Sequence, residues 1–265
     1  MHTQIMGVLN ATPDSFYVAS RFTIEGAITR ALEMVEEGAS IIDIGGESTR
    51  PGSDPISVKE ELERVIPIIE GIVDKTKAKI SVDTSKSEVA QKAIEAGATI
   101  VNDITGMKDS KMREIAADEK VEVVIMHMQG SPHTMQVHPQ YRDLIGEIES
   151  FFIERIIDCE NDGISSSHII LDPGIGFGKT TQHNIEILKN LDTFKKLEKR
   201  ILIGASRKSF IGKILQNEEH PLAPEDRLEG SLAIASYCAL KGIDILRVHD
   251  VKETLHAVKI AELLK

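Results

Sequence analysis

Aromatic residues and cysteine are scarce in this sequence. Of its 265 residues, none is Trp, 4% are aromatic and two are cysteines, Cys159 and Cys238. Their separation fits neither a zinc site nor a redox pair, so we expect two buried thiols in a reducing cytosol. No apolar run approaches the ~18 residues of a membrane span, and residues 1–4 lack the features of a signal peptide. These absences predict a cytoplasmic globular protein.

Positive charge is also in short supply. The chain has 42 acidic against 31 basic side chains, a formal net charge of −11. A protein whose main task is to hold nucleic acid, or to lie on an anionic membrane, needs clustered Lys and Arg instead. Neither partner is therefore expected, although a local basic pocket for a small anion is compatible with this balance.

Eight short β-branched runs recur along the chain, and each is followed by a turn and then by a helical pattern. They cover residues 5–9, 40–44, 79–82, 99–101, 121–126, 168–171, 200–203 and 244–248. Most are continuously apolar, which is typical of strands buried on both faces of a parallel sheet. Eight strand–helix units in about 250 residues predict an α/β fold, a single-domain (β/α)8 TIM barrel over residues 1–265. A doubly wound open sheet is the alternative, disfavoured because no second domain is evident.

Polar side chains end seven of the eight predicted strands. In chain order they are Asn10, Asp43, Asp83, Asn102 with Asp103, His127, Asp172, and Arg247 with His249. Asn and Asp also start turns and cap helices, which could explain any one of them alone. Because the carboxyl ends of barrel strands form one mouth where active sites are built, we expect these side chains to face a shared pocket.

Cationic residues lie on or just after three of the eight predicted strands. Arg50 comes after the second strand, Arg207 and Lys208 come after the seventh, and Arg247 lies on the eighth. Carboxylates on the floor of a pocket can pair with a ring edge that offers parallel N–H groups. Residues 204–208 precede a predicted helix, whose backbone N–H groups would attract a phosphate. The pocket is therefore predicted to take a donor-rich ring with an anionic tail.

The sequence disfavours four other motifs. Residues 174–180 resemble a P-loop and a dinucleotide loop, but Pro173 and Lys179 occupy positions that require glycine in these two motifs. His127, His133 and His138 straddle a loop with two prolines, which disfavours zinc. The absence of a Gly-x-Ser-x-Gly elbow disfavours a hydrolase.

Eight motifs in order resemble those of the bacterial dihydropteroate synthase family. They are residues 6–16 (MGVLNATPDSF), 45–52 (GGESTRPG), 81–84 (SVDT), 101–103 (VND), 126–130 (MHMQG), 172–179 (DPGIGFGK), 206–209 (SRKS) and 247–250 (RVHD). The resemblance implies a (β/α)8 barrel, usually a homodimer and a sulfonamide target, that acts in folate synthesis. Members join 6-hydroxymethyl-7,8-dihydropterin diphosphate to 4-aminobenzoate and release pyrophosphate with Mg2+.

The same resemblance assigns site residues. It implies that the pterin diphosphate is bound by Asp83, Asn102, Met126, Asp172, Lys208, Arg247 and His249. Among these it implies catalytic roles for Asp83, Lys208 and Arg247. For 4-aminobenzoate it implies Thr49, Arg50, Pro51, Phe177 and Ser209. Asn10 resembles the Mg2+ ligand. Loss of diphosphate from a CH2 group on an electron-rich ring needs no nucleophilic side chain, so the lack of a catalytic dyad is expected.

The first loop departs from the family pattern. Where the family continues Ser-Asp-Gly-Gly, this chain has Tyr17-Val18-Ala19-Ser20-Arg21, so Val18 replaces the loop aspartate. We expect this change to affect the rate rather than the pterin pocket. One alternative is a methyltransferase that passes a folate methyl group to a corrinoid protein, which has no need of residues 45–52 or 206–209. The other is a catalytically silent pterin-binding protein, which only the lost aspartate favours.

Overall fold

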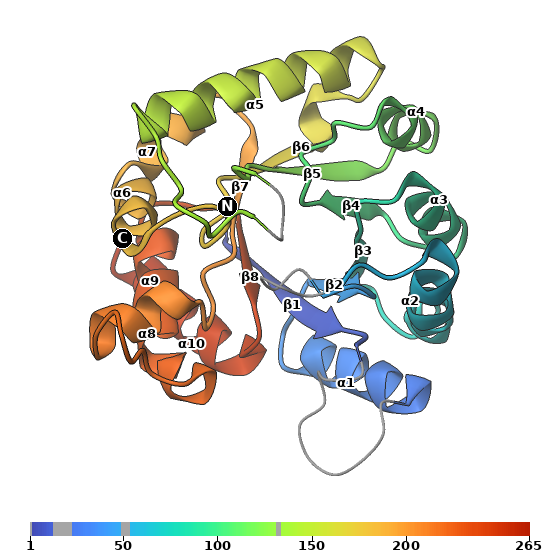
Figure 1. Ribbon diagram of the computed structural model, residues 1–265. Coiled ribbons are helices and arrows are strands. Elements are labelled where there is room, and N and C mark those ends of the chain that lie inside the picture. Colours follow the sequence, from blue (N-terminus) through green and yellow to red (C-terminus); the bar gives the residue numbers. More distant parts are fainter. Residues whose placement is uncertain (1, 13–22, 49–53, 131–133) are drawn as a thin grey trace.

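Eight parallel strands close into a barrel in chain order, with β8 returning to pair with β1 (Figure 1). The computed structural model describes residues 2–12, 23–48, 54–130 and 134–265. The strands are β1 Gln4–Asn10, β2 Ile41–Gly45, β3 Lys79–Asp83, β4 Ile100–Asp103, β5 Glu122–Met126, β6 Ile169–Asp172, β7 Arg200–Ile203 and β8 Ile245–Val248. The predicted (β/α)8 barrel is confirmed, and the open-sheet alternative is wrong because the sheet has no free edge.

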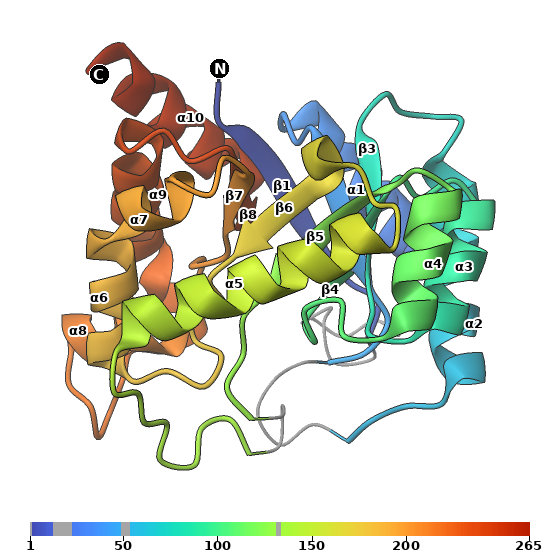
Figure 2. The same cartoon turned by 90° about the horizontal axis from the view of Figure 1, so that it is seen from above.

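Helices surround the barrel and connect successive strands (Figures 1 and 2). They are α1 Ile24–Glu36, α2 Val58–Ile72, α3 Ser87–Glu95, α4 Ser110–Asp118, α5 Leu144–Asn161, α6 Thr181–Lys189, α7 Leu191–Lys195, α8 Ser209–Leu215, α9 Leu228–Leu240 and α10 Val251–Leu263, with short 3-10 turns at Ser166–His168 and Pro224–Arg227. The connections after β6 and β7 each contain two helices rather than the single one expected. In the described ranges, no helix is long and apolar enough to cross a membrane.

Side-chain caps explain where several of these helices begin. Thr23 accepts a hydrogen bond from Gly26 N, and Ser57 accepts one from Glu60 N. Asp143 caps α5 in the same way. Each cap satisfies a backbone N–H that has no partner within the first helical turn. These polar residues therefore fix the ends of the loops that lead away from the barrel mouth.

The interior of the barrel is an apolar layer separate from the core beneath the helices. It consists of Met6, Ile41, Ile100, Val124, Ile170, Leu202 and Ile245. Because side chains alternate between the two faces of a strand, the residues two positions further on also face inward. Those residues are Val8, Asp43, Asn102, Met126, Asp172, Gly204 and Arg247. The strand pleat thus places a polar layer directly above the apolar one.

The amino-terminal end of the barrel is closed by an ion-pair cluster. Glu122 Oε1 accepts from Lys79 Nζ at 3.0 Å and from Arg200 Nη2 at 2.7 Å. The two chain ends meet on this side, where Thr3 N donates to Glu262 Oε1 at 2.7 Å (Figure 2). Since active sites of such barrels lie at the opposite face, this cluster is structural.

Removal of interior volume at Leu202 is expected to destabilise the fold. Leu202 is 0% exposed within the apolar layer, so Leu202→Ala should lower the free energy of unfolding by about 2–5 kcal/mol. Denaturant titration measures the change. Val137→Ala is the control, because Val137 is 69% exposed and its truncation should change stability by less than about 0.5 kcal/mol. Equal effects of the two substitutions would contradict the layered core.

Candidate active site

An ion-pair network centred on Arg247 lies inside the carboxyl-terminal mouth of the barrel. Arg247 Nε donates to Asp43 Oδ2 at 2.6 Å, and Arg247 Nη2 donates to Asp83 Oδ2 at 2.6 Å. The three residues come from β8, β2 and β3, so the guanidinium reaches past β1 to join the two carboxylates. The network thus ties together strands that are not all neighbours.

Asp43 is the deepest member of this network and is 0% exposed. Ser81 Oγ donates to its Oδ1 at 2.6 Å, and Asn102 Nδ2 donates to its Oδ2 at 3.1 Å. Together with Arg247, these donors offset the cost of burying a carboxylate. The sequence pattern predicted Asp43 at the end of its strand, but β2 continues to Gly45. Asp43 therefore lies deeper in the barrel, below the other polar side chains of the mouth.

The members of this network differ in how readily they gain or lose a proton. Burial alone would lower the pKa of Arg247, but the carboxylates of Asp43 and Asp83 outweigh that effect and raise it. Burial raises the pKa of Asp83 to about 7, although Arg247 opposes the shift. Arg247 is therefore a fixed cation, whereas Asp83 can take up a proton near neutral pH.

A second pair of charges lines the opposite wall. Asp172, at the end of β6, accepts a hydrogen bond from Gly174 N at 2.8 Å. Burial raises the pKa of Asp172, while that hydrogen bond and the charge of Lys208 partly oppose the shift. The Lys208 ammonium lies 3.9 Å from the centroid of the Phe177 ring, a cation–π contact. Burial lowers the pKa of Lys208 to about 8, so this cation is easily tuned by what binds beside it.

The glycine-rich loop after β6 brings its backbone close to these side chains. Gly174 has φ +67°, and a Cβ there would lie 2.0 Å from His127 O. Gly176 has φ +81°, and a Cβ there would lie 3.0 Å from Lys208 Cδ. Only glycine combines that backbone conformation with such close approach. Packing therefore explains why glycine occupies these two positions.

Lys179 fixes the same loop from the outer side of the barrel. It is 3% exposed, and its Nζ lies 2.9 Å from Phe177 O, 3.2 Å from His127 O and 3.1 Å from His127 Nδ1. Burial lowers the pKa of Lys179 to about 7 and that of His127 to about 3. A neutral imidazole and two carbonyl oxygens therefore hold this lysine in place of a carboxylate.

Two strand-end residues, His127 and Asp103, were predicted to face the pocket, but their side chains point away from the barrel interior. His127 packs edge-on against Phe151, with ring centroids 5.0 Å apart, on the helix side of the barrel. Asp103 accepts hydrogen bonds from Thr105 and from Met107 N and so forms a turn. Both follow an inward-facing residue directly, and the strand pleat turns them outward.

The structure brings together most of the residues predicted to bind ligand. Asp83, Asn102, Met126, Asp172 and Arg247 converge from five strands, Lys208 and Phe177 from adjoining loops. Asn10 is half-buried at the end of β1, His249 contacts Ser206, and Ser209 is the exposed first residue of α8. Thr49, Arg50 and Pro51 lie outside the described residues, as does the altered segment with Val18.

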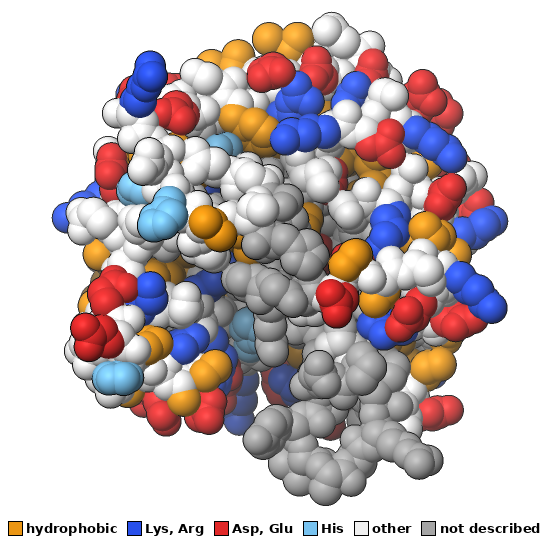
Figure 3. All heavy atoms as spheres, viewed as in Figure 1, with side chains coloured by type: hydrophobic (Ala, Val, Ile, Leu, Met, Phe, Trp, Pro, Cys, Tyr) orange, Lys and Arg blue, Asp and Glu red, His pale blue; other side chains and the backbone are white. Residues whose placement is uncertain are grey.

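Figure 3 looks onto this end of the molecule, where the described acidic and basic side chains are interspersed. Among the described residues, no group of three or more His, Cys, Asp or Glu side chains could hold a metal. The described part of the rejected histidine cluster therefore offers no such group.

Sequence reasoning missed three residues that shape the pocket. Ser81 supports Asp43, Lys179 holds Phe177 O, and Asn184 Oδ1 accepts from Gly176 N at 2.7 Å. Only Ser81 carried a usable signal, since it precedes Asp83 by two positions and so shares its face of the strand. Arg207, predicted as a pocket cation, instead binds Asp250 in a bidentate ion pair.

Comparison with known proteins gives one consistent result. A family profile described as pterin binding enzyme matches residues 6–249. The dihydropteroate synthase of Escherichia coli K12 is 46% identical over 262 residues, covering 98% of this chain and 91% of that protein. The Yersinia pestis enzyme, solved with a sulfonamide drug complex, aligns with a TM-score of 0.93 at 42% identity, over 99% of this chain and 94% of that one. The Xanthomonas albilineans enzyme with 4-aminobenzoic acid has a TM-score of 0.92 at 40% identity, over 99% and 93%.

The chain belongs to the family of pterin-binding enzymes. That class fits a barrel mouth where buried carboxylates and cations meet. Its activity is that of a dihydropteroate synthase, a transferase of folate biosynthesis. The resemblance drawn from the eight motifs is therefore confirmed, and the corrinoid methyltransferase alternative is dropped.

The buried His127 predicts a specific pH dependence of stability. Its imidazole titrates near 6.5 when unfolded and near 3 in the native protein. Between those values the unfolded chain binds a proton that the native protein does not, so stability falls as pH falls. His127→Gln should be destabilising at pH 7, and its deficit should shrink as pH falls from about 6.5 toward about 3.

Chemical denaturation across this pH range measures the effect. His256→Gln is the control, because His256 is exposed on α10. A deficit of the His127 variant that stays constant with pH would show that the native imidazole takes up its proton at the same pH as the unfolded chain, and that its contact with Lys179 is misassigned.

Proposed function

We propose that the pocket binds 6-hydroxymethyl-7,8-dihydropterin diphosphate with the pyrimidine edge of the ring on Asp172 and Asn102. Gly174 N holds one carboxylate oxygen of Asp172 at 2.8 Å, which orients the other toward a ligand. Asn102 gives its amide nitrogen to Asp43, so its amide oxygen is the acceptor available to a ring N–H. Two fixed acceptors on neighbouring walls match a ring edge with several N–H donors. Buried Met126 would pack on the ring face.

The observation that carries this proposal is the convergence of Asp83, Asp172, Arg247 and Lys208 at one mouth of the barrel. The reaction breaks the bond between the pterin CH2 carbon and the diphosphate oxygen, and the amine nitrogen of 4-aminobenzoate bonds to that carbon. The bond electrons leave with the diphosphate, and the amine gives up a proton. Positive charge develops on the ring and negative charge on the leaving group, so carboxylates and cations suffice as catalysts.

Each catalytic residue then has a separate role. Asp83, as a carboxylate, would stabilise the developing ring cation, and its pKa near 7 permits it to take up a proton. Arg247 would lie against the ring and, together with His249, bind the departing diphosphate. Lys208 would bond to the ring from above and hold negative charge beside it. All three act electrostatically, without a covalent intermediate on the protein.

The slot for 4-aminobenzoate would lie beside Phe177, Lys208 and exposed Ser209. The Lys208 ammonium over the Phe177 ring offers an aromatic surface with a cation at its edge, which suits an aromatic carboxylate. Thr49, Arg50 and Pro51 complete this slot in our proposal, on the family resemblance alone. The pterin and the aminobenzoate would thus share Lys208 as a common neighbour.

A magnesium ion fits the residues near β1 as part of this proposal. Mg2+ prefers oxygen ligands and is usually held by one or two protein groups, substrate phosphates and waters. Asn10 supplies one half-buried amide oxygen on the same face of β1 as Met6 and Val8. When bound with the diphosphate, the ion would neutralise charge on the leaving group.

We also propose a homodimer in the cytoplasm. Apolar side chains of the adjacent helices α9 and α10 are exposed, among them Leu240, Ile260 and Leu263. An exposed apolar surface of this kind favours pairing with a second copy. Cys159 and Cys238 are buried free thiols, which is compatible with a reducing compartment.

Release of pyrophosphate from the two substrates tests the proposed function. The parent protein should release it only when both are present, whereas a catalytically silent binder would release none. Arg247→Lys should lower the rate by about 10²-fold or more, because an ammonium cannot fork between two carboxylates or stabilise charge as a guanidinium does. Arg200→Lys, at the opposite end of the barrel, is the matched control. Near-parent turnover of the Arg247 variant would show that this position supplies charge alone.

Asp172→Asn should weaken binding of a pterin analogue while the fold is retained. Replacement of a buried carboxylate that bonds to the ring should cost ~2–5 kcal/mol of binding free energy. Calorimetry with the analogue measures the change, and Asp192→Asn on the surface serves as the control. A tenfold loss of affinity corresponds to about 1.4 kcal/mol. A loss of less than about threefold would therefore refute the assignment of Asp172 to the pterin ring.

A further inference from the structure

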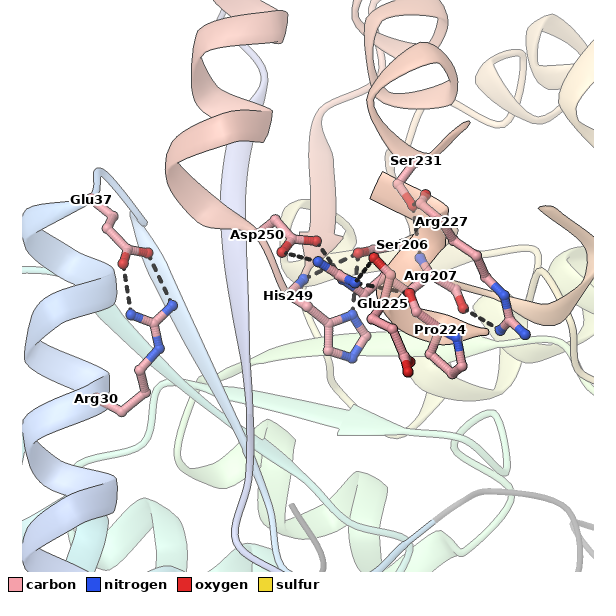
Figure 4. A network of polar contacts seen from close by, with 10 residues as sticks. All are labelled: Arg30, Glu37, Ser206, Arg207, Pro224, Glu225, Arg227, Ser231, His249 and Asp250. Carbon is pink, nitrogen blue, oxygen red and sulfur yellow. Dashed lines mark hydrogen bonds and ion pairs between the residues drawn. The ribbon is translucent and has the colours of Figure 1, made fainter. Parts of the chain in front are cut away.

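All three nitrogens of the Arg207 guanidinium donate hydrogen bonds to protein groups. Its Nε and Nη2 donate to the two carboxylate oxygens of Asp250, both at 2.7 Å. Its Nη1 donates to Pro224 O at 2.8 Å and to Glu225 O at 3.1 Å (Figure 4). Arg207 lies in the loop after β7, and Asp250 lies in the loop after β8. The guanidinium therefore joins the two loops that carry the cationic side of the pocket.

The backbone of Arg207 is held as firmly as its side chain. Its N–H donates to Ser231 Oγ at 2.9 Å, and its carbonyl accepts from Arg227 Nη1 at 2.9 Å. Its φ is +57°, in the left-handed region that non-glycine residues rarely adopt. Such a conformation persists only where surrounding contacts impose it, and it is common where geometry serves function. The contacts of Arg207 thus impose an otherwise unfavourable backbone.

The residues that precede the two members of this ion pair, Ser206 and His249, also contact each other. Ser206, which precedes Arg207, has its Oγ 3.2 Å from both N and Nδ1 of His249 (Figure 4). His249 in turn precedes Asp250. The Arg207–Asp250 pair and the Ser206–His249 contact are therefore two adjacent links between the same two loops. Loss of the first link would let the second open and move His249.

We infer that Arg207 is a positioning residue, which holds His249 against Ser206 through Asp250 and so shapes the anion-binding side of the pocket. This inference rests on the proposed function, in which His249 and Arg247 bind the departing diphosphate. The ring side is held independently, since Gly174 fixes Asp172 and Phe177 supports Lys208. Disruption of the ion pair should therefore weaken anion binding and spare ring binding.

Calorimetry with two separate probes, inorganic pyrophosphate and a phosphate-free pterin analogue, tests this inference. Arg207→Lys and Asp250→Asn should each weaken pyrophosphate binding by about 10- to 100-fold, the range that corresponds to a lost charged hydrogen bond. Affinity for the analogue should change by less than about threefold, a difference below 1 kcal/mol. The double variant should be no weaker than the worse single variant, because both remove one interaction.

Asp250→Asn also separates positioning from direct contact. If Arg207 itself bound the anion, removal of the competing carboxylate would leave pyrophosphate binding intact or strengthen it, and that result would overturn the inference. Equal weakening of both probes would overturn it as well, since it would indicate general loosening of the pocket. Should Arg207→Lys fail to fold, Asp250→Asn decides alone.

A second ion pair of the same kind provides the matched control. Arg30 donates to both carboxylate oxygens of Glu37, at 2.6 and 3.1 Å, on the outer helix α1 (Figure 4). Its side chain is 30% exposed, against 24% for Arg207. Arg30→Lys should leave binding of both probes unchanged. The failure of the proposed function would look different, because the parent itself would then bind neither probe.

Discussion

A guanidinium enclosed in the barrel between two carboxylates is the constraint on which this structure depends. Arg247 joins Asp43 and Asp83, and its charge offsets part of the cost of burying both carboxylates. An enclosed ion pair gives little net stability, but it requires its partners to be present and in register. Since these partners come from separate strands, the polar layer can form only when the barrel is closed. The site and the fold are thus one arrangement.

The strand pleat divides polar residues between two tasks. Inward-facing residues such as Asp172 and Asn102 line the barrel mouth, while Asp103 and His127, which face outward, organise the loops that surround it. Lys179 connects the two sets, because it holds the carbonyl of Phe177 on which the Lys208 contact depends. The geometry of the pocket therefore rests on residues that never face it.

Most of the fold and much of the site could be predicted from the sequence, for identifiable reasons. Eight apolar runs, each followed by a helix, predict a barrel, because strands buried on both faces of a parallel sheet are continuously apolar. Asp83, Asn102, Asp172 and Arg247 could be located because each ends or nearly ends a strand. The side-chain direction of His127 required the exact pleat, and the partner of Arg207 lies 43 positions away in the chain. Neither the direction of the His127 side chain nor the ion pair of Arg207 can be read from the neighbouring sequence.

In the proposed complex, a pterin ring binds to Asp172 and Asn102 while Arg247 keeps its carboxylate partners. A crystal structure with a bound pterin analogue tests it most directly. We expect ring N–H groups within hydrogen-bond distance of Asp172 Oδ2 and Asn102 Oδ1, and an intact ion pair between Arg247 and Asp43. A ring bound elsewhere in the barrel mouth, or a guanidinium that leaves Asp43 to contact the ring edge, would contradict it.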